Sequence, residues 1–221
     1  MTLPCVERET GPAPRHSIVW LHGLGADGHD FEPIVPELVA REWPALRFVF
    51  PHAPVRPVTI NNGMAMRAWY DIKGTDIASR QDEDGVRASV RELDALIARE
   101  AERGVPASRV FVAGFSQGGA IALAGAVRHG EALAGVVALS TYLPVAEKTA
   151  AERHASNATI PVFMAHGSHD PIVPQPLGAL SRDHLRALGY TVDWHTYPMA
   201  HQVCAEEIAD LRQWLAARLT A

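Results

Sequence analysis

The segment from residue 114 to residue 119, Gly-Phe-Ser-Gln-Gly-Gly, most constrains what this chain can fold into. It contains a G-x-S-x-G motif between two apolar stretches. Residues 109–113 are largely apolar and β-branched, which predicts a buried strand, and residues 120–127 are small and apolar on all sides, which predicts a buried helix. A direct turn from strand to helix holds a serine on a strained elbow, with its hydroxyl above the sheet edge. Ser116 is therefore a candidate nucleophile.

The motif alone is a weak signal, because glycine and serine are common and a five-residue pattern recurs by chance. The simpler interpretation is a turn of small residues without chemistry. The predicted strand and helix around it favour the nucleophile instead. In such an elbow Gly114 and Gly118 have a steric role, and the helix N-terminus offers N–H groups and a positive dipole end to an oxyanion.

Composition sets broader limits on the fold and its partners. The 221 residues are 48% hydrophobic and 20% charged, which predicts a single domain over residues 1–221 with a large core. A net charge of −5, without a dense run of Lys or Arg, argues against nucleic-acid binding. Cys5 and Cys204 have the spacing of neither a disulfide framework nor a metal site. The first nine residues lack the features of a signal peptide and no apolar run spans a bilayer, which predicts a cytoplasmic protein.

Predicted strands and helices alternate along the chain. The predicted strands are residues 17–21, 46–50, 109–113, 135–140, 160–165 and 191–197. The predicted helices are residues 33–42, 83–103, 120–127, 175–188 and 206–219. This order predicts an α/β fold with a mostly parallel central sheet and helices on both faces, in which residues 191–197 alternate like an edge strand.

One segment, residues 51–81, does not fit this alternation. It is rich in proline and carries Met64, Met66, Trp69 and Tyr70, and it is too long and too apolar for an ordinary connection. We expect an irregular insertion here. It has two interpretations, the wall of a pocket for an apolar ligand or a loop that packs its own hydrophobic side chains onto the domain. The sequence leaves both open.

A serine hydroxyl needs a base to take its proton and a carboxylate to orient that base. In an open parallel sheet, reactive groups lie just past the carboxyl ends of the strands. Asp170 follows the predicted strand at 160–165, and His201 follows the one at 191–197. The order Ser116, Asp170, His201 is the chain order expected of an elbow serine in an α/β-hydrolase. These three residues are the predicted catalytic triad.

Other histidines are less well placed. His195 lies within a predicted strand and His184 within a predicted helix. His166 and His169 flank Asp170, but their spacing in a turn after a strand does not bring two imidazoles together as i, i+4 spacing on a helix does. We therefore expect no metal. A purely structural His201 stays an alternative, which the agreement of strand end, chain order and elbow disfavours.

An oxyanion hole is the remaining requirement. One donor is expected to be the N–H of Gln117, the residue after the nucleophile, and the other an N–H from the loop after an early strand. That loop is residues 22–28, His-Gly-Leu-Gly-Ala-Asp-Gly. Its glycines let the backbone turn toward a substrate, and the Leu24 amide is the candidate, whereas His22 is expected to brace the loop. The G-x-G-x-x-G pattern of a dinucleotide site is not met, so no cofactor is expected.

With these residues assembled, the chain resembles the bacterial carboxylesterase and acyl-protein thioesterase family, also described as the phospholipase/carboxylesterase family of α/β-hydrolases. The resemblance extends from Val19 to the last predicted helix. It is carried by residues 22–28, 50–54, 61–63, 67–71, 114–119, 166–173 and 199–201.

The resemblance implies roles for individual residues. Ser116, Asp170 and His201 are implied as the triad, and Leu24 and Gln117 as the oxyanion donors through their backbone N–H groups. The segment around residues 61–70 is implied to border the acyl groove. The candidate substrate-binding residues are Leu24, Met64, Met66, Trp69, Tyr70 and Val173.

The resemblance also implies an activity. It is that of a serine carboxylesterase, which hydrolyses carboxylic esters and thioesters of short to medium acyl chains through an acyl-enzyme, without a cofactor and as a frequent homodimer. Two alternatives remain open. One is an acyl-protein thioesterase or lysophospholipase that acts on long acyl chains, and the other is a hydrolase-shaped binding protein without turnover.

Overall fold

The computed structural model describes residues 2–74 and 81–219. In that part of the chain, one sheet has the strand order β1-β3-β2-β6-β7-β8-β9, in which every neighbouring pair is parallel except β1 with β3. Its strands are β1 Cys5–Glu9, β2 His16–Leu21, β3 Leu46–Pro51, β6 Val110–Phe115, β7 Gly135–Leu139, β8 Val162–Gly167 and β9 Val192–Tyr197. The predicted α/β fold with a mostly parallel sheet is confirmed, and β9 lies at an edge as its alternation predicted.

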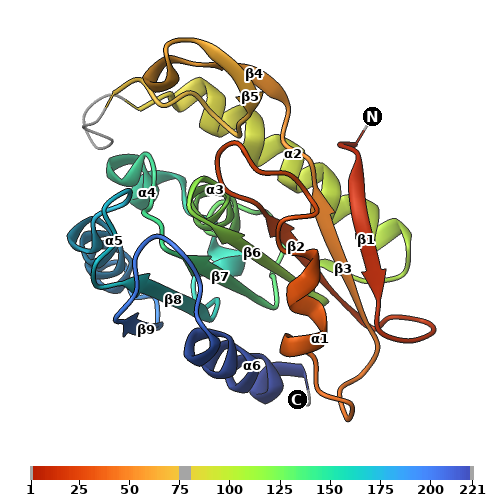
Figure 1. The fold of residues 1–221 in the computed structure, drawn as a ribbon. Helices are drawn as coiled ribbons and strands as arrows, with labels where there is room; N and C mark the ends of the chain where they lie inside the picture. The colour runs from red at the N-terminus through yellow and green to blue at the C-terminus, as the bar shows by residue number, and fades with distance from the viewer. Residues whose placement is uncertain (1, 75–80, 220–221) are drawn as a thin grey trace.

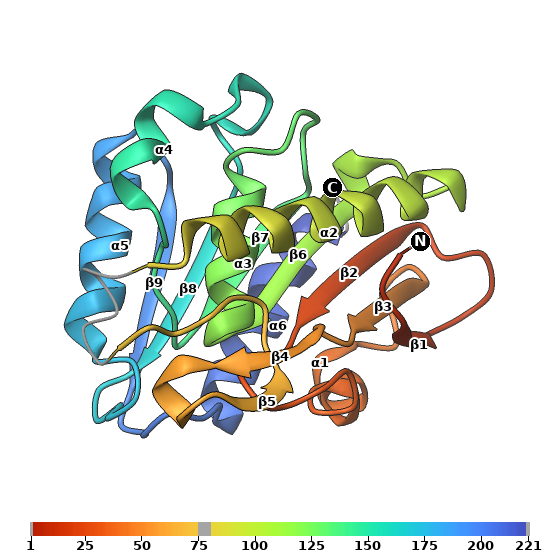
Figure 2. The same cartoon turned by 90° about the horizontal axis from the view of Figure 1, so that it is seen from above.

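Helices form a layer on each face of this sheet (Figures 1 and 2). They are α1 Val35–Leu38, α2 Glu83–Glu102, α3 Gln117–Ala126, α4 Ala146–Glu152, α5 Gln175–Ala187 and α6 Ala205–Leu219. Helices α2 to α5 pack on one face and α1 and α6 on the other, so the core has two halves. Alternate residues of a strand contribute to the two halves. On β2, Val19 and Leu21 belong to one half, and Ile18 and Trp20 to the other.

The predicted helix at residues 33–42 is wrong in length. A 3-10 turn at Glu32–Ile34 leads into α1, which ends at Leu38, and Val39 is already extended with ψ 135°. The prolines at positions 33 and 36 stand in the first turns of the 3-10 segment and of α1, where a missing N–H is tolerated, and nothing in the structure explains why α1 ends at Leu38. By contrast, α2 begins at Glu83 as predicted. None of the helices in the described residues is long and apolar enough to cross a membrane.

The insertion expected at residues 51–81 is more regular than predicted. A hairpin of β4 (Val55–Val58) and β5 (Met64–Arg67) occupies its centre, with a 3-10 turn between the strands. Asn62 and Gly63 both have positive φ, which is the backbone that an Asn-Gly turn supplies. Residues 75–80 of the predicted insertion lie outside the described residues. Figure 1 shows the hairpin at one end of the molecule, across from α1 and α6.

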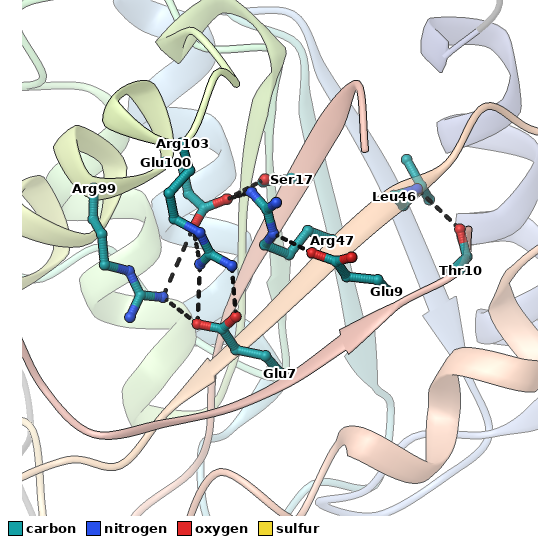
Figure 3. Close-up of polar contacts among 9 residues, drawn as sticks. All are labelled: Glu7, Glu9, Thr10, Ser17, Leu46, Arg47, Arg99, Glu100 and Arg103. Carbon is teal, nitrogen blue, oxygen red and sulfur yellow. Dashed lines mark hydrogen bonds and ion pairs between the residues drawn. The ribbon is translucent and has the colours of Figure 1, made fainter. Parts of the chain in front are cut away.

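Strand β1, which was not predicted from the sequence, is tied to α2 by a network of charges around the buried Glu100 (Figure 3). The Glu100 carboxylate has no solvent exposure and accepts hydrogen bonds from Arg47 on β3 and Arg103 at the end of α2, both at 2.9 Å. The Ser17 hydroxyl of β2 also donates to it. Glu7 of β1 binds the guanidinium of Arg103 at 2.8 Å. The network therefore joins three strands to one helix.

Glu100→Ala is expected to lower the free energy of unfolding by about 3 kcal/mol, because it removes the buried acceptor shared by Arg47, Arg103 and Ser17 and leaves the buried Arg47 guanidinium with Glu9 as its remaining partner. Urea denaturation measures this loss. Glu102→Ala, an exposed glutamate in the same helix turn, is the matched control and should change stability by less than about 0.5 kcal/mol. Equal losses in the two variants would contradict the role assigned to the network.

Glu207, in the first turn of α6, makes stability depend on pH. Burial raises the pKa of its carboxyl from 4.5 to about 8. Between these values the folded protein holds a proton that the unfolded chain releases, so the free energy of unfolding falls as pH rises from 4.5 to 8. Glu207→Gln, which removes the charge, should abolish this slope and stabilise the protein at pH 8 by an amount on the order of 3 kcal/mol, with little effect near pH 5.

Urea titrations at several pH values across that window measure the slope. Glu206→Gln changes an exposed glutamate one position earlier and should leave the slope as it is. If Glu207→Gln keeps the wild-type slope, another group is responsible for it.

Candidate active site

Ser116 lies on a strained turn between β6 and α3, with φ 53° and ψ −119°. Left-handed backbone of this kind costs a non-glycine residue about 1–3 kcal/mol. Two glycines make the turn sterically feasible. A Cβ on Gly114 would lie 2.4 Å from the carbonyl carbon of Gly118, and a Cβ on Gly118 would lie 2.3 Å from the carbonyl oxygen of Leu21. The motif glycines thus let backbone segments approach each other closely beneath the serine.

A continuous chain of hydrogen bonds links the three predicted triad residues. Nε2 of His201 lies 2.9 Å from Oγ of Ser116, and Nδ1 of His201 lies 2.7 Å from Oδ2 of Asp170. The other carboxylate oxygen of Asp170 accepts the backbone N–H groups of Ile172 and Val173, both at 2.9 Å. Since an ionised carboxylate only accepts, Nδ1 of His201 carries the proton and Nε2 is free to accept one from the serine. This geometry suits proton transfer from Ser116.

The sheet brings Asp170 and His201 to the same place. Asp170 follows β8 and His201 follows β9, and these strands are parallel neighbours whose carboxyl ends meet at one edge. Their loops are joined by the N–H of Ser168, which donates to the Tyr197 carbonyl at 2.8 Å, and by the N–H of His169, which donates to a carbonyl of the other loop at 3.1 Å. The distance between acid and base is therefore fixed by backbone hydrogen bonds.

The loop at residues 22–28 is braced by His22, as predicted. The His22 side chain is buried, its Nε2 accepts the N–H of Ala53 at 3.0 Å, and its Nδ1 donates to the carbonyl of Gly23 at 2.7 Å. These two roles require a neutral imidazole. Burial lowers the pKa of His22 to about 4, which keeps the ring neutral at physiological pH.

Both predicted oxyanion donors are backbone N–H groups without an acceptor among the described residues. Gln117 is the first residue of α3, and a helix provides no partner for its first N–H groups. In the loop after β2, the N–H of Gly25 donates to the Arg67 carbonyl at 2.9 Å. Within residues 2–74 and 81–219, no acceptor is found for the N–H of Leu24. The two amides are therefore available to an external oxygen.

The side chain of Gln117 has a second role that the sequence analysis missed. Its Oε1 accepts the backbone N–H of Trp69 at 2.8 Å, and its Nε2 donates to the Tyr70 carbonyl at 2.7 Å. The indole N–H of Trp69 donates to the carbonyl of His22 at 2.9 Å. Residues 69 and 70 are thereby fixed to both predicted oxyanion segments. A polar residue directly after the elbow serine is the only sequence signal for this contact.

The candidate substrate-binding residues fall into two groups. The side chains of Trp69, Tyr70 and Val173 are buried, and the Tyr70 hydroxyl lies 2.8 Å from the Tyr142 hydroxyl. For Trp69 and Tyr70 the structure supports the second interpretation of their segment, namely packing onto the domain. The second group is accessible: Leu24 and Met66 are half-buried, and Met64 is 65% exposed. Contact of these residues with a substrate stays a prediction.

A groove beside His201 was not predicted. It has a volume of about 480 Å³ and lies between the end of β6, the segment at α1 and the start of α6. Its lining includes Phe31, Ile34, Phe115, His201, Val203 and Cys204. The resemblance implies an acyl groove around residues 61–70 and does not point to this one, because a groove built from three segments distant in sequence leaves no local pattern.

One group of side chains in the described residues has the composition of a metal site. Ligand atoms of Asp27, His29 and His52 lie within 4.8 Å of one another. Hydrogen bonds inside the protein already use these groups: Nδ1 of His52 accepts the N–H of Gly28 at 3.0 Å, and Oδ1 of Asp27 lies 3.1 Å from Nδ1 of His29. The expectation of no metal stays a prediction.

Comparison with known proteins shows the family to which the chain belongs. Residues 3–219 match the phospholipase/carboxylesterase family. The chain is 38% identical to acyl-protein thioesterase 1 of Neurospora crassa, over 99% of this chain and 91% of the relative. Among solved structures it is similar to SOBER1 of Arabidopsis thaliana, with a TM-score of 0.88 and 32% identity over 93% of this chain and 99% of that one. Acyl-protein thioesterase 2 of Zea mays has a TM-score of 0.84 and 30% identity, over 97% and 99%.

The family match covers nearly the whole chain, and the identities to these relatives show common descent. The observed fold agrees with that of the similar solved structures. The predicted serine-hydrolase class is confirmed by these relatives. The chain therefore belongs to the phospholipase/carboxylesterase family of α/β-hydrolases.

Proposed function

We propose that this protein hydrolyses carboxylic esters and thioesters of short to medium acyl chains through an acyl-enzyme on Ser116. The observation that carries the proposal is the continuous hydrogen-bond chain from Asp170 through His201 to the Ser116 hydroxyl. A buried carboxylate, a correctly oriented imidazole and a hydroxyl on a strained elbow are the parts that activate a serine.

The reaction has two halves. In the first, Oγ of Ser116 bonds to the acyl carbon while His201 takes its proton, and His201 then gives that proton to the oxygen or sulfur of the leaving group as its bond to the acyl carbon breaks. In the second, His201 takes a proton from water as the water oxygen bonds to the acyl carbon, and His201 then gives that proton to Oγ of Ser116 as the bond between Oγ and the acyl carbon breaks. The products are a carboxylic acid and an alcohol or thiol.

Charge on the substrate oxygen is stabilised by two backbone donors. We assign this role to the amides of Leu24 and Gln117, which have no acceptor among the described residues of the protein. Each such donor contributes about 3–4 kcal/mol to transition-state stabilisation in acyl-transfer enzymes. The Gln117 amide lies at the N-terminus of α3, so the positive end of the helix dipole also stabilises the negative charge on the substrate oxygen.

Deacylation of lipidated proteins is the second candidate function. Its support is the identity of relatives such as the acyl-protein thioesterase 1 of Neurospora crassa. The two candidates differ in acyl length and leaving group. The homodimer and the cytoplasmic location implied by the sequence also stay proposals.

A profile of kcat/KM over p-nitrophenyl esters of increasing acyl length, with a thioester and an S-palmitoyl peptide alongside, decides between them. We expect kcat/KM to be highest for short and medium chains. A maximum at the long chains, with turnover of the palmitoyl peptide, would instead support the protein thioesterase. Absence of turnover for every substrate, together with no labelling of Ser116 by a fluorophosphonate, would support the binding protein without turnover.

A further inference from the structure

The groove beside His201 has a wall of aromatic and aliphatic side chains. Its wall contains the ring of Phe115, whose centroid lies 4.7 Å from that of His201, and the ring of Phe31, 5.6 Å from that of Phe115. Val203 and Ile34 add aliphatic surface. The groove thus begins at the imidazole and continues over an apolar, partly aromatic wall.

The position of the groove relative to the catalytic triad indicates which part of a substrate binds in it. In the first half of the proposed reaction, the leaving atom must come within hydrogen-bond distance of Nε2 of His201 to receive its proton. The leaving group therefore starts at this imidazole. The hairpin of β4 and β5, which carries Met64 and Met66, lies on another side of the molecule from α1 and α6 (Figure 1). The acyl and leaving groups consequently have separate surfaces available.

Charge around the groove favours some leaving groups over others. Two carboxylates, those of Asp30 and Glu37, belong to its lining, and its lining contains no lysine or arginine. Aromatic faces such as that of Phe31 attract cations. An anionic leaving group would meet these carboxylates without a compensating positive charge, at a cost in binding free energy.

We propose that this groove is the leaving-group site and that it selects apolar or aromatic leaving groups that are neutral or cationic over anionic ones. The inference rests on the proposed function, because it requires His201 to act as the proton donor. The substrates are then esters and thioesters whose alcohol or thiol has an apolar body, without a phosphate or carboxylate close to the ester or thioester bond.

Selective blocking of the groove tests its location. The chain has two cysteines, and both are half-buried: Cys204 lines the groove, whereas Cys5 lies on β1 at the far edge of the sheet. In Cys5→Ser, a bulky maleimide attaches only to Cys204. Burial raises the pKa of both thiols, so labelling is carried out at mildly alkaline pH.

Labelled and unlabelled Cys5→Ser are compared with ethyl butyrate and naphthyl butyrate, which share one acyl group. We expect the label to lower kcat/KM for the naphthyl ester at least tenfold and to change the ethyl ester less than about twofold, since ethanol is too small to need the groove. The matched control is Cys204→Ser, assayed before and after labelling at Cys5. In this variant the label should change kcat/KM for neither ester. Equal loss for both esters, or loss for neither, overturns the proposed location.

Charge selection is tested by neutralising the two carboxylates. Phenyl butyrates with a meta trimethylammonium, tert-butyl or sulfonate substituent provide cationic, neutral and anionic leaving groups. For each ester, kcat/KM of the variant is divided by kcat/KM of the wild type, so that differences in the intrinsic reactivity of the esters cancel. Asp30→Asn combined with Glu37→Gln should raise kcat/KM for the sulfonate ester about threefold to tenfold, lower it for the trimethylammonium ester by a similar factor and leave the tert-butyl ester unchanged.

The single-charge control is Glu102→Gln, on an exposed position of α2, for which all three ratios should stay near one. Three equal ratios in the double variant would overturn charge selection. The proposed function fails in a different way: if Ser116 is not the nucleophile, fluorophosphonate does not label it, and the unmodified protein turns over none of these esters.

Discussion

Ser116→Ala is expected to lower kcat for ester hydrolysis about a million-fold, to the level that substrate binding and the oxyanion donors alone provide. Removal of Oγ takes away the atom that forms the acyl-enzyme, and His201 then has no nucleophile at its Nε2, where the hydroxyl now lies 2.9 Å away. Alanine occupies the elbow with the same backbone as serine, so the free energy of unfolding should change little. Assay of p-nitrophenyl butyrate hydrolysis and fluorophosphonate labelling measure the effect.

Ser108→Ala is the matched control, because Ser108 is exposed and lies before β6, away from the triad. It should retain wild-type turnover and labelling. If Ser116→Ala keeps substantial turnover while it is folded by circular dichroism, another residue is the nucleophile and the proposed mechanism is wrong.

Asp170→Asn is expected to lower kcat about ten-thousand-fold with a small change in KM. In the wild type, Oδ2 of Asp170 accepts a hydrogen bond from the N–H at Nδ1 of His201 at 2.7 Å. The other oxygen is held by the amides of Ile172 and Val173, so an asparagine would keep its carbonyl there and turn its NH₂ toward His201. The imidazole would then carry its proton on Nε2 and could not accept one from Ser116.

The pair formed by Asp193 and His195 provides a matched control. Their side chains are hydrogen-bonded at 3.0 Å on β9, outside the triad, so Asp193→Asn removes a comparable carboxylate from a histidine. It should leave kcat within about twofold of the wild type. A similarly small effect of Asp170→Asn would show that His201 does not depend on this carboxylate for its tautomer.

The triad could be predicted from the sequence because its positions follow from local patterns. Strand residues before Asp170 and His201 were recognisable from their apolar runs, and parallel strands place their carboxyl ends at one edge. The structure shifts the strand before Asp170 by two residues, to Val162–Gly167, which leaves the argument intact because the acid still follows the strand end. Errors of this size at strand ends matter little when the residue concerned lies in the following loop.

Other features could not be predicted, since their signals are not periodic. Strand β1 ends in three consecutive charged residues, residues 7–9, and is stabilised by pairing with β3 and by arginines at the end of α2 that are distant in sequence. The hairpin within residues 51–81 has a local signal in its Asn-Gly turn, but the prolines and irregular spacing around that turn favour an irregular loop.

The sequence by itself determined the elbow at Ser116, the α/β class and the identity of the three residues now joined by hydrogen bonds. These depend on short-range sterics, on side-chain periodicity and on the handedness of parallel crossovers, all of which act within a few tens of residues. Only the tertiary structure decided which side chains surround the serine. The strand order β1-β3-β2-β6-β7-β8-β9 brings α1 against α6, turns Trp69 inward onto Gln117 and opens the groove at His201. Such contacts arise from close packing between segments far apart in sequence, and packing leaves no period along the chain.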